Sequence, residues 1–242
     1  VYLATVGATS ATWTNNLFVE NIAVDKGGAV YDSAQNLITY ANNSFLGNEA
    51  SSGGAYYGVH ADFDLVNNLF AYTQGGDALD VSTSGSGYDI DYNGFYSNLT
   101  NDWSSSVSVT SGTNLSSDPK LTDYSLDGDC SNDDYVLELT SPLIDAGDPN
   151  ILDPAPPTDR SDIGVYGGPD ADPEKFADTD SDDVVAMWDC DDTVDTIYPG
   201  ATEVPYDSID QDCDGQASNL NCEDCYGILQ ESPSATDGVY SI

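Results

Sequence analysis

A short phrase recurs at nearly constant spacing through the first 100 residues, and it limits the fold more than any other feature. The phrase reads Asn-Asn-x-Phe, with Tyr replacing the first Asn in the last copy. A fixed period of this length predicts a solenoid, because each repeat is a small unit that buries its apolar face only against its neighbours. The copies are spaced 27, 25 and 25 residues apart and lie at 15–18, 42–45, 67–70 and 92–95.

The residues between these copies predict about three short strands per repeat. Gly-Gly pairs at 27–28, 53–54 and 75–76 favour tight turns, and apolar residues alternate with polar ones at 63–66 and 88–92. Three strands per repeat predicts an all-β parallel β-helix, in which each coil pairs its strands with the next coil. A β-sandwich needs no such self-similarity. In the β-helix the repeated Phe residues stack in an interior column, and the Asn row forms a side-chain amide ladder at a bend.

The Asn-x-x-Phe phrase followed by Gly-Gly-Ala-x-Tyr resembles the right-handed parallel β-helix repeat family of bacterial surface proteins, over roughly residues 12–168. The phrases at 118–121, 141–148 and 159–168 resemble the closing segment of that family. This resemblance implies a right-handed solenoid and a final segment that wraps the last coil and protects its strand edges. Arg160, the only Arg, is expected to pair with neighbouring Asp residues there.

The charge of the chain divides it into parts and excludes several classes of partner. The chain has 43 acidic and 4 basic residues, a formal net charge of −39. Too few cations are present to bind nucleic acid or anionic lipid, and no apolar stretch is long enough for membrane insertion. Residues 1–100 carry 10 acidic residues, whereas 118–225 carry 30 together with all 5 cysteines. We expect β-helix coils at 1–115, a closing segment at 116–168, and an Asp/Cys-rich calcium-binding module with a C-terminal tail at 169–242.

Alternating carboxylates predict a first cation-binding loop in the last module. Position 7 of this loop is Val184, placed to offer a backbone carbonyl, and position 6 is Asp183, where Gly is usual. Alternate acidic residues suit Ca²⁺ because the loop curls around the ion and presents oxygen ligands from several sides. Asp178, Asp180, Asp182 and Asp189 stand at positions 1, 3, 5 and 12 of an EF-hand-like pattern.

A second acidic stretch repeats the start of this pattern with the expected Gly. Asp210, Asp212 and Asp214 are followed by Gly215, but the twelfth position is Asn221 and offers no acid. The remaining ligands of this loop are expected from among Asp191, Asp192, Asp195, Asp207 and Glu203. The insert at 127–134 has the composition of either a third cation site or a solvated acidic turn.

The phrase from Asp189 to Gly215 closely resembles the MopE-type metal-binding motif of secreted bacterial proteins, over about residues 178–215. Family members with copper chemistry use His and modified Trp, whereas the single His here, His60, lies in the predicted solenoid. Oxygen ligands select Ca²⁺ over copper, so we expect two or more calcium ions.

The cysteines favour an oxidising environment. Cys190 and Cys213 flank the predicted ligands and are expected to form a disulfide, Cys222 and Cys225 are a second possible pair, and Cys130 is then left over. Any four of these cysteines allow three connectivities. Sequons at 42–44, 98–100 and 114–116 also suit an extracellular or cell-surface protein.

These features favour a non-catalytic extracellular structural or adhesive protein. The first residues align with the inside of a coil, at 30–31 and 56–57, so we expect either a removed upstream segment or head-to-tail stacking with other copies of the chain. Cell-surface components are further possible partners, and the tail at 239–242 alternates like an edge strand.

The alternative is a β-helix protein that binds or degrades polysaccharide. A lyase of this kind needs a cationic base, for which the coils offer Lys26 and His60, and a hydrolase needs paired carboxylates such as Asp77 and Asp80. Four tyrosines are candidates for stacking on sugar rings if they are exposed. They are Tyr40, Tyr57, Tyr72 and Tyr96.

Overall fold

The computed structural model describes residues 2–3, 10–34, 37–60, 62–82, 87–109, 112–154, 159–205 and 207–217. It divides into two compact units, Val1–Phe176 and Ala177–Ile242, which are described separately. The first residue, the predicted pair Cys222–Cys225 and the tail strand at 239–242 lie outside the described residues.

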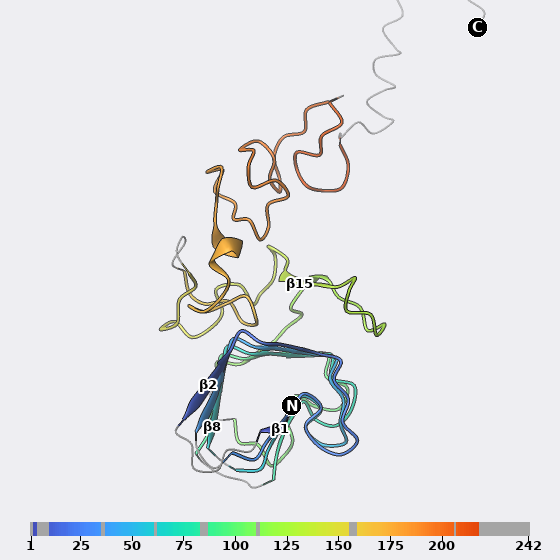
Figure 1. The fold of residues 1–242 in the computed structure, drawn as a ribbon, viewed down its shortest axis with the longest axis vertical. Helices are drawn as coiled ribbons and strands as arrows, with labels where there is room; N and C mark the ends of the chain where they lie inside the picture. Colours follow the sequence, from blue (N-terminus) through green and yellow to red (C-terminus); the bar gives the residue numbers. More distant parts are fainter. Residues whose placement is uncertain are drawn as a thin grey trace, which may run out of the picture. The chain divides into compact units, whose positions relative to one another are not determined.

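The first unit is a β-solenoid of about four coils, as the repeat predicts. Each coil contributes one strand to each of three parallel sheets, so that Figure 1 shows successive coils overlying one another. The sheet orders are β1-β4-β7-β10, β2-β5-β8-β11 and β3-β6-β9-β12-β13. The strands are β1 Tyr2–Leu3, β2 Ala11–Thr14, β3 Leu17–Val19, β4 Val30–Asp32, β5 Ile38–Ala41, β6 Ser44–Leu46, β7 Tyr56–Gly58, β8 Phe63–Val66, β9 Leu69–Ala71, β10 Leu79–Val81, β11 Asp89–Asp91, β12 Gly94–Tyr96 and β13 Leu115–Ser116.

The predicted Phe column is confirmed. Phe18, Phe45, Phe70 and Phe95 are register partners in the third sheet. Their rings stack inside the coils with successive centroid distances of 4.8, 4.7 and 5.3 Å. Stacked rings bury a large apolar area in every coil, which is the main term that holds a solenoid together.

The predicted amide ladder is also confirmed, and the two Asn of each pair have different roles. In the second position, each Nδ2 donates to the Oδ1 of the equivalent Asn one coil further on. The first position turns the corner with a positive φ, 51° at Asn15, 52° at Asn42 and 56° at Asn67, which Asn tolerates better than most residues. The ladder consists of Asn16, Asn43, Asn68, Asn93 and Asn114.

The Asn residues of the three sequons have structural roles in the coils. The side-chain nitrogens of Asn42, Asn98 and Asn114 all donate to groups of the fold: Ser161, Phe70 and Ile90 respectively. Structural Asn in repeated turns therefore explains the three sequons without glycosylation.

Two tyrosines predicted to be exposed are buried instead. Tyr40 is fully buried because it lies on the inward face of β5, and Tyr57 is 5% exposed. Tyr40 and Tyr56 both donate their hydroxyls to Oδ2 of Asp32, at 3.0 and 3.1 Å, so the core contains a hydrogen-bonded carboxylate.

The closing segment lies along the side of the coil stack, which corrects the expectation that it wraps the last coil. It begins with an antiparallel pair, β14 Leu121–Asp123 and β15 Asp134–Leu137, and continues without regular strands. Leu143 and Ile163 pack on the outer face of the third sheet, against Leu46 and Leu69. The side chains on the outer face of this sheet are small or apolar, and the closing segment shields them from solvent. The same segment reaches the first coil, where Asn15 donates to the carbonyls of residues 165 and 167.

Arg160 holds this segment closed through carbonyl groups rather than through Asp residues. Its Nη2 donates to the carbonyl of Ala146 at 2.9 Å, its Nε donates to the carbonyl of Gly147, and its guanidinium lies over the ring of Tyr92, 5.5 Å from the centroid. A short helix η1, Pro173–Phe176, ends the first unit.

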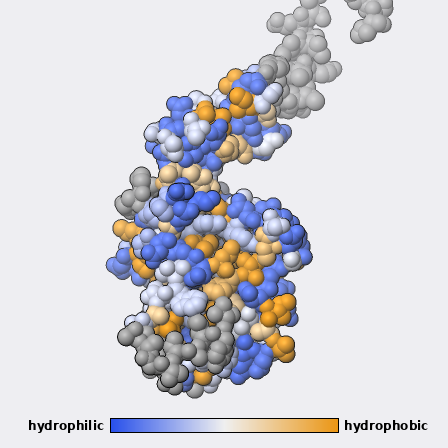
Figure 2. All heavy atoms as spheres, in the orientation of Figure 1, coloured by the Kyte–Doolittle hydropathy of each residue, from blue (hydrophilic) through white to orange (hydrophobic). Residues whose placement is uncertain are grey.

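The described part of the second unit, 177–205 and 207–217, consists of turns and irregular segments and contains no strand or helix. Its buried residues are Val185 and Gln211, and hydrophilic residues predominate on the face that Figure 2 shows. The predicted disulfide between Cys190 and Cys213 is present. Over the described parts of both units, no helix combines the length and the apolar character that crossing a bilayer requires.

Candidate metal centre

The first acidic loop gathers its carboxylates into two overlapping groups. Oxygens of Asp178, Asp180 and Asp192 lie within 4.8 Å of one another, and so do oxygens of Asp180, Asp182 and Asp189. Because Asp180 belongs to both groups, the five side chains form one connected cluster. The predicted ligands at positions 1, 3, 5 and 12 are therefore brought together.

Local hydrogen bonds explain why the chain curls here. The carboxylate of Asp178 accepts the amides of Ser181 at 2.7 Å and Asp183 at 3.2 Å, and Asp192 accepts both the amide and the hydroxyl of Thr179. Asp183 occupies the position where Gly is usual and still adopts a φ of 74°. Asp tolerates this left-handed conformation because its side chain can bond locally.

Several oxygens of the first loop are buried and have no hydrogen-bond donor. They are both carboxylate oxygens of Asp180 and the Oδ2 atoms of Asp182 and Asp189. Desolvation raises the pKa of Asp180 and Asp189 above the usual value, and the neighbouring carboxylates add to the effect. Converging, unpartnered carboxylate oxygens are costly unless a cation compensates them. The first loop therefore fits a bound cation.

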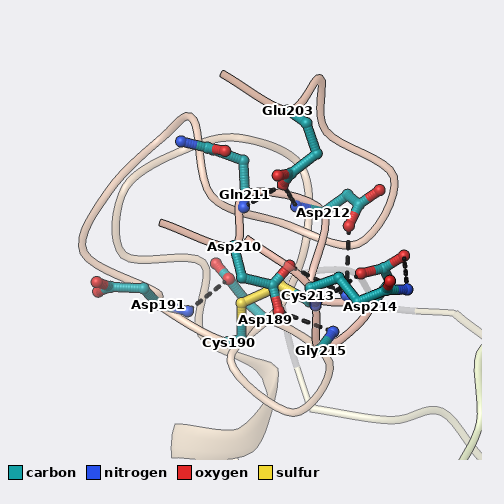
Figure 3. Close-up of a disulfide and its surroundings, with 11 residues drawn as sticks. Asp189, Cys190, Asp191, Glu203, Asp210, Gln211, Asp212, Cys213, Asp214 and Gly215 are labelled. Carbon is teal, nitrogen blue, oxygen red and sulfur yellow. Dashed lines mark hydrogen bonds between the residues drawn. A yellow bond between two sulfur atoms is a disulfide. The ribbon is translucent and has the colours of Figure 1, made fainter. Parts of the chain in front are cut away.

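The second loop is built around Glu203, Asp210 and Asp212, whose oxygens also lie within 4.8 Å of one another (Figure 3). Glu203 Oε1 accepts the amides of Gln211 and Asp212, at 2.6 and 3.1 Å, while its Oε2 is buried without a donor. Desolvation raises the pKa of Asp212, with the charge of Asp214 as the next cause. Gly215 supplies the expected positive φ, 86°. This loop also fits a cation.

Glu203 was one of five candidates for the remaining ligands of the second loop, and the structure groups it with Asp210 and Asp212. The spacing argument alone does not select it, because it precedes the alternating acids instead of following them. Asp195, another candidate for the second loop, is exposed and lies outside the three carboxylate groups. Four further predicted ligands also lie outside these groups. Their contacts shape the loops: the amide of Val184 donates to Asp182, Asp191 accepts the Thr193 hydroxyl, Asp207 accepts from Ile209 and Gln211, and Asp214 accepts the amide of Gln216.

The disulfide lies against both loops. A carboxylate oxygen of Asp189 and the sulfurs of Cys190 and Cys213 lie within 4.8 Å of one another. Each cysteine directly follows a clustered acid, Asp189 in the first loop and Asp212 in the second (Figure 3).

The insert at 127–134 is a hydrogen-bonded acidic turn. Asp127 accepts the amide of Asp129 and the side chain of Asn132, which lowers the pKa of Asp127, and Asp129 accepts from Ser131. Its carboxylates form none of the groups that could hold a metal among the described residues. Cys130 is a free thiol there and is exposed.

Three of the four residues considered for catalysis in the coils take part in hydrogen bonds of the fold. Asp77 accepts from Asn101 at 2.6 Å, and Asp80 accepts from Ser104 at 2.5 Å. Lys26 donates to the hydroxyl of Tyr57 and lies over its ring, and His60 is exposed.

Comparison with known proteins gives one family match, and it lies in the second unit. The model of a MopE family, described as a "putative metal-binding motif", matches residues 189–219. A transmembrane domain-containing protein of Dictyostelium discoideum is 42% identical over 55 residues, which cover 23% of this chain and 3% of that protein. The chain thus spans only a small fraction of this relative's length. No solved structure matches the chain. The chain therefore combines a β-solenoid with a segment similar to a metal-binding motif.

Proposed function

We propose that the second unit binds two calcium ions, one in each acidic loop, and that the ions stabilise its fold. The observation that carries this proposal is the set of buried carboxylate oxygens without donors at Asp180, Asp182, Asp189 and Glu203. Asp178 and Asp192 complete the first ligand set, and Asp210 and Asp212 complete the second. A bound cation neutralises the converging carboxylates and replaces the hydration that they lose on folding.

The ligand chemistry favours Ca²⁺ over softer metals. The grouped ligands are carboxylate oxygens, apart from the two cysteines, whose sulfurs are bonded to each other. A disulfide offers no thiolate to zinc or copper, and carboxylate and carbonyl oxygens suit Ca²⁺. The match to a metal-binding motif supports a bound metal in this unit, and the choice of Ca²⁺ rests on the ligand chemistry.

We further propose that the whole chain is a non-catalytic extracellular building block of the right-handed parallel β-helix repeat type. The solenoid supplies a stiff rod, and the calcium-binding unit joins it to other copies or to cell-surface components. The Phe column and the Asn ladder support the rod role, because identical contacts repeat in every coil. The disulfide supports an oxidising location. Polymerisation is tested by sedimentation with and without calcium; a monomer under all conditions would refute the joining role.

The calcium assignment is tested by calorimetric titration of the purified chain with Ca²⁺. We expect two ions to bind, Asp180→Asn to abolish binding in the first loop, and Glu203→Gln to weaken it in the second. Asp195→Asn is the matched control, because Asp195 is exposed and belongs to none of the clusters. The assignment is wrong if the chain binds no Ca²⁺, or if the control lowers binding as much as Asp180→Asn does.

A polysaccharide ligand is a second candidate, favoured by one feature of the solenoid. A polar hollow of about 470 Å³ is lined by Trp103 together with Asn98, Thr100, Asn101 and Asp102. Amide, hydroxyl and indole groups of this kind suit sugar binding. A glycan array with Trp103→Ala as the comparison tests this candidate, and equal binding by both chains would contradict it.

A further inference from the structure

We infer that the Cys190–Cys213 disulfide couples the two acidic loops, so that occupation of one loop by a cation raises the cation affinity of the other. This inference rests on the proposed function, since it concerns the same two loops. It adds that cation binding in one loop is thermodynamically coupled to cation binding in the other, which the sequence pattern of each loop does not show.

The first step is the position of the disulfide relative to the ligands. Cys190 follows Asp189, whose buried Oδ2 lacks a donor, and Cys213 follows Asp212 (Figure 3). The bond spans 23 positions in sequence and places the Asp189 carboxylate within 4.8 Å of both sulfurs. Any movement of Asp212 away from its cluster therefore moves Cys213, and through it Cys190 and Asp189.

The second step is how each loop is shaped. Within the first loop, Thr179 bonds to Asp192, and within the second, Glu203 bonds to the amides of Gln211 and Asp212. These bonds order each loop by itself and do not cross from one loop to the other. Besides the main chain at 193–202, the disulfide is the covalent link that joins them, and it does so directly beside Asp189 and Asp212.

The third step is the small apolar core of this unit. Among residues 177–205 and 207–217, the buried hydrophobic side chain is Val185. A unit with so little apolar burial relies on cross-links and bound ions to offset the loss of chain entropy. When a cation orders one loop, the disulfide holds the other loop near its bound geometry, and the second cation then orders less chain.

The experiment uses the oxidised full chain and Tb³⁺ as a luminescent probe for calcium sites, with Ca²⁺ competition. Trp188 precedes Asp189 and sensitises an ion in the first loop, while Trp13 and Trp103 belong to the first unit. Glu203→Gln, made in the second loop, is expected to weaken first-loop binding by about fivefold to fiftyfold. In the Cys190→Ala/Cys213→Ala background, the same substitution should change first-loop affinity by less than about twofold. Asp195→Asn is the matched control in both backgrounds.

The outcomes separate this inference from the proposed function. If the oxidised chain binds no ion, the proposed function fails. If both loops bind but Glu203→Gln leaves the first loop unchanged, or weakens it equally without the disulfide, the coupling is refuted. Should the double-alanine chain fail to fold, calorimetry on the oxidised chain decides. Reciprocity then requires an ion in the first loop to raise the Ca²⁺ affinity of the second loop by the same factor as an ion in the second loop raises that of the first, so Asp180→Asn must also weaken the second loop. Independent binding by the two loops overturns the inference.

Discussion

At the scale of single residues, several Asn and Asp residues adopt positive φ angles, a conformation that usually favours glycine. Asn and Asp tolerate this conformation because their short side chains can form local hydrogen bonds. Asn15, Asn42 and Asn67 use this conformation at the corners of the solenoid, where their side chains are free to bind the closing segment. In the second unit, Asp183 and Gly215 occupy the same position of the two acidic loops, with φ angles of 74° and 86°. The two loops thus adopt one turn geometry with two different residues.

This equivalence predicts that Asp183→Gly stabilises the calcium-loaded second unit. A non-glycine residue is strained in the left-handed conformation. Replacing Asp183 with glycine should therefore raise the free energy of unfolding by roughly 0.5–1 kcal/mol. Gly215→Ala should lose a similar amount. Denaturant unfolding followed by Trp188 fluorescence in saturating Ca²⁺ measures both. Asp183→Asn controls for the lost charge, and a glycine variant no more stable than this control would disprove the argument.

Buried carboxyl groups in the closing segment predict a pH dependence of the first unit. Asp162 and Asp153 are 3% and 7% exposed. Desolvation raises the pKa of Asp162 to about 7 and that of Asp153 to about 6, from an unfolded value of 3.8. The folded state therefore binds these protons more tightly than the unfolded state. Their stabilising contribution is complete below about pH 4 and is lost as the pH rises through 6 and 7.

We accordingly expect the first unit to be about 1–3 kcal/mol more stable near pH 5 than near pH 8. Thermal melts of the β-sheet circular dichroism signal across this range measure the effect. Asp162→Asn should flatten much of the dependence, because it replaces the buried carboxyl with a neutral group of the same shape. The exposed Asp170→Asn is the control. A wild-type melting temperature that rises with pH would show that the sign is wrong.

At the scale of structural elements, a second amide ladder runs along the coils and is interrupted in the third coil. Asn21 donates to the Oδ1 of Asn48, and the amide of Thr73 donates to the Oδ1 of Asn98. Thr73 occupies the position of Asn in this row and is fully buried, yet its hydroxyl has no partner. The second ladder therefore lacks one side-chain amide, at Thr73.

Thr73→Asn is expected to complete this ladder and raise the free energy of unfolding of the first unit by about 1 kcal/mol. The new amide can accept from the amide of Asn48 and donate to the Oδ1 of Asn98, as the other rungs do. Chemical denaturation of the coils measures the gain. Thr73→Val is the control, because it removes the unpaired hydroxyl without adding an amide. If valine stabilises the coils as much as asparagine does, the ladder explanation is wrong.

The sequence predicted the coils because their contacts repeat. Phe18 and Phe45 occupy the same position in successive repeats and are register partners in the sheet, so the repeat spacing in the sequence predicts their contact. The position of the closing segment was not predictable in this way, since its contacts with Asn15 and Asn67 span 152 and 94 positions and occur once. Glu203 could be named from the sequence only as one of five candidates, for a related reason. Spacing identifies ligands that alternate within one loop, whereas Glu203 reaches its cluster only after the chain folds back through Gln211.

At the scale of the whole molecule, the two units use different sources of stability. The first has a continuous apolar core of coil residues and repeated amide bonds. The second has Val185 as its buried hydrophobic residue among 177–205 and 207–217, together with a disulfide and clustered carboxylates. Removing cations should therefore affect the two units unequally, because the carboxylate groups that could hold a metal among the described residues all lie in the second unit.

We predict that a chelator unfolds 177–217 and leaves the coils intact. Hydrogen exchange should show loss of protection in the second unit, while the sheet signal of the first unit stays within about 10% of its calcium-loaded value. A chain carrying Asp180→Asn and Glu203→Gln should lose the response to calcium, because two of the unpartnered carboxylates no longer repel their neighbours. Loss of the coil signal together with the second unit would show that the ions support the whole molecule. An unchanged exchange pattern in excess chelator would show that hydrogen bonds and the disulfide suffice. Only selective loss in 177–217 fits a unit whose fold depends on its ions.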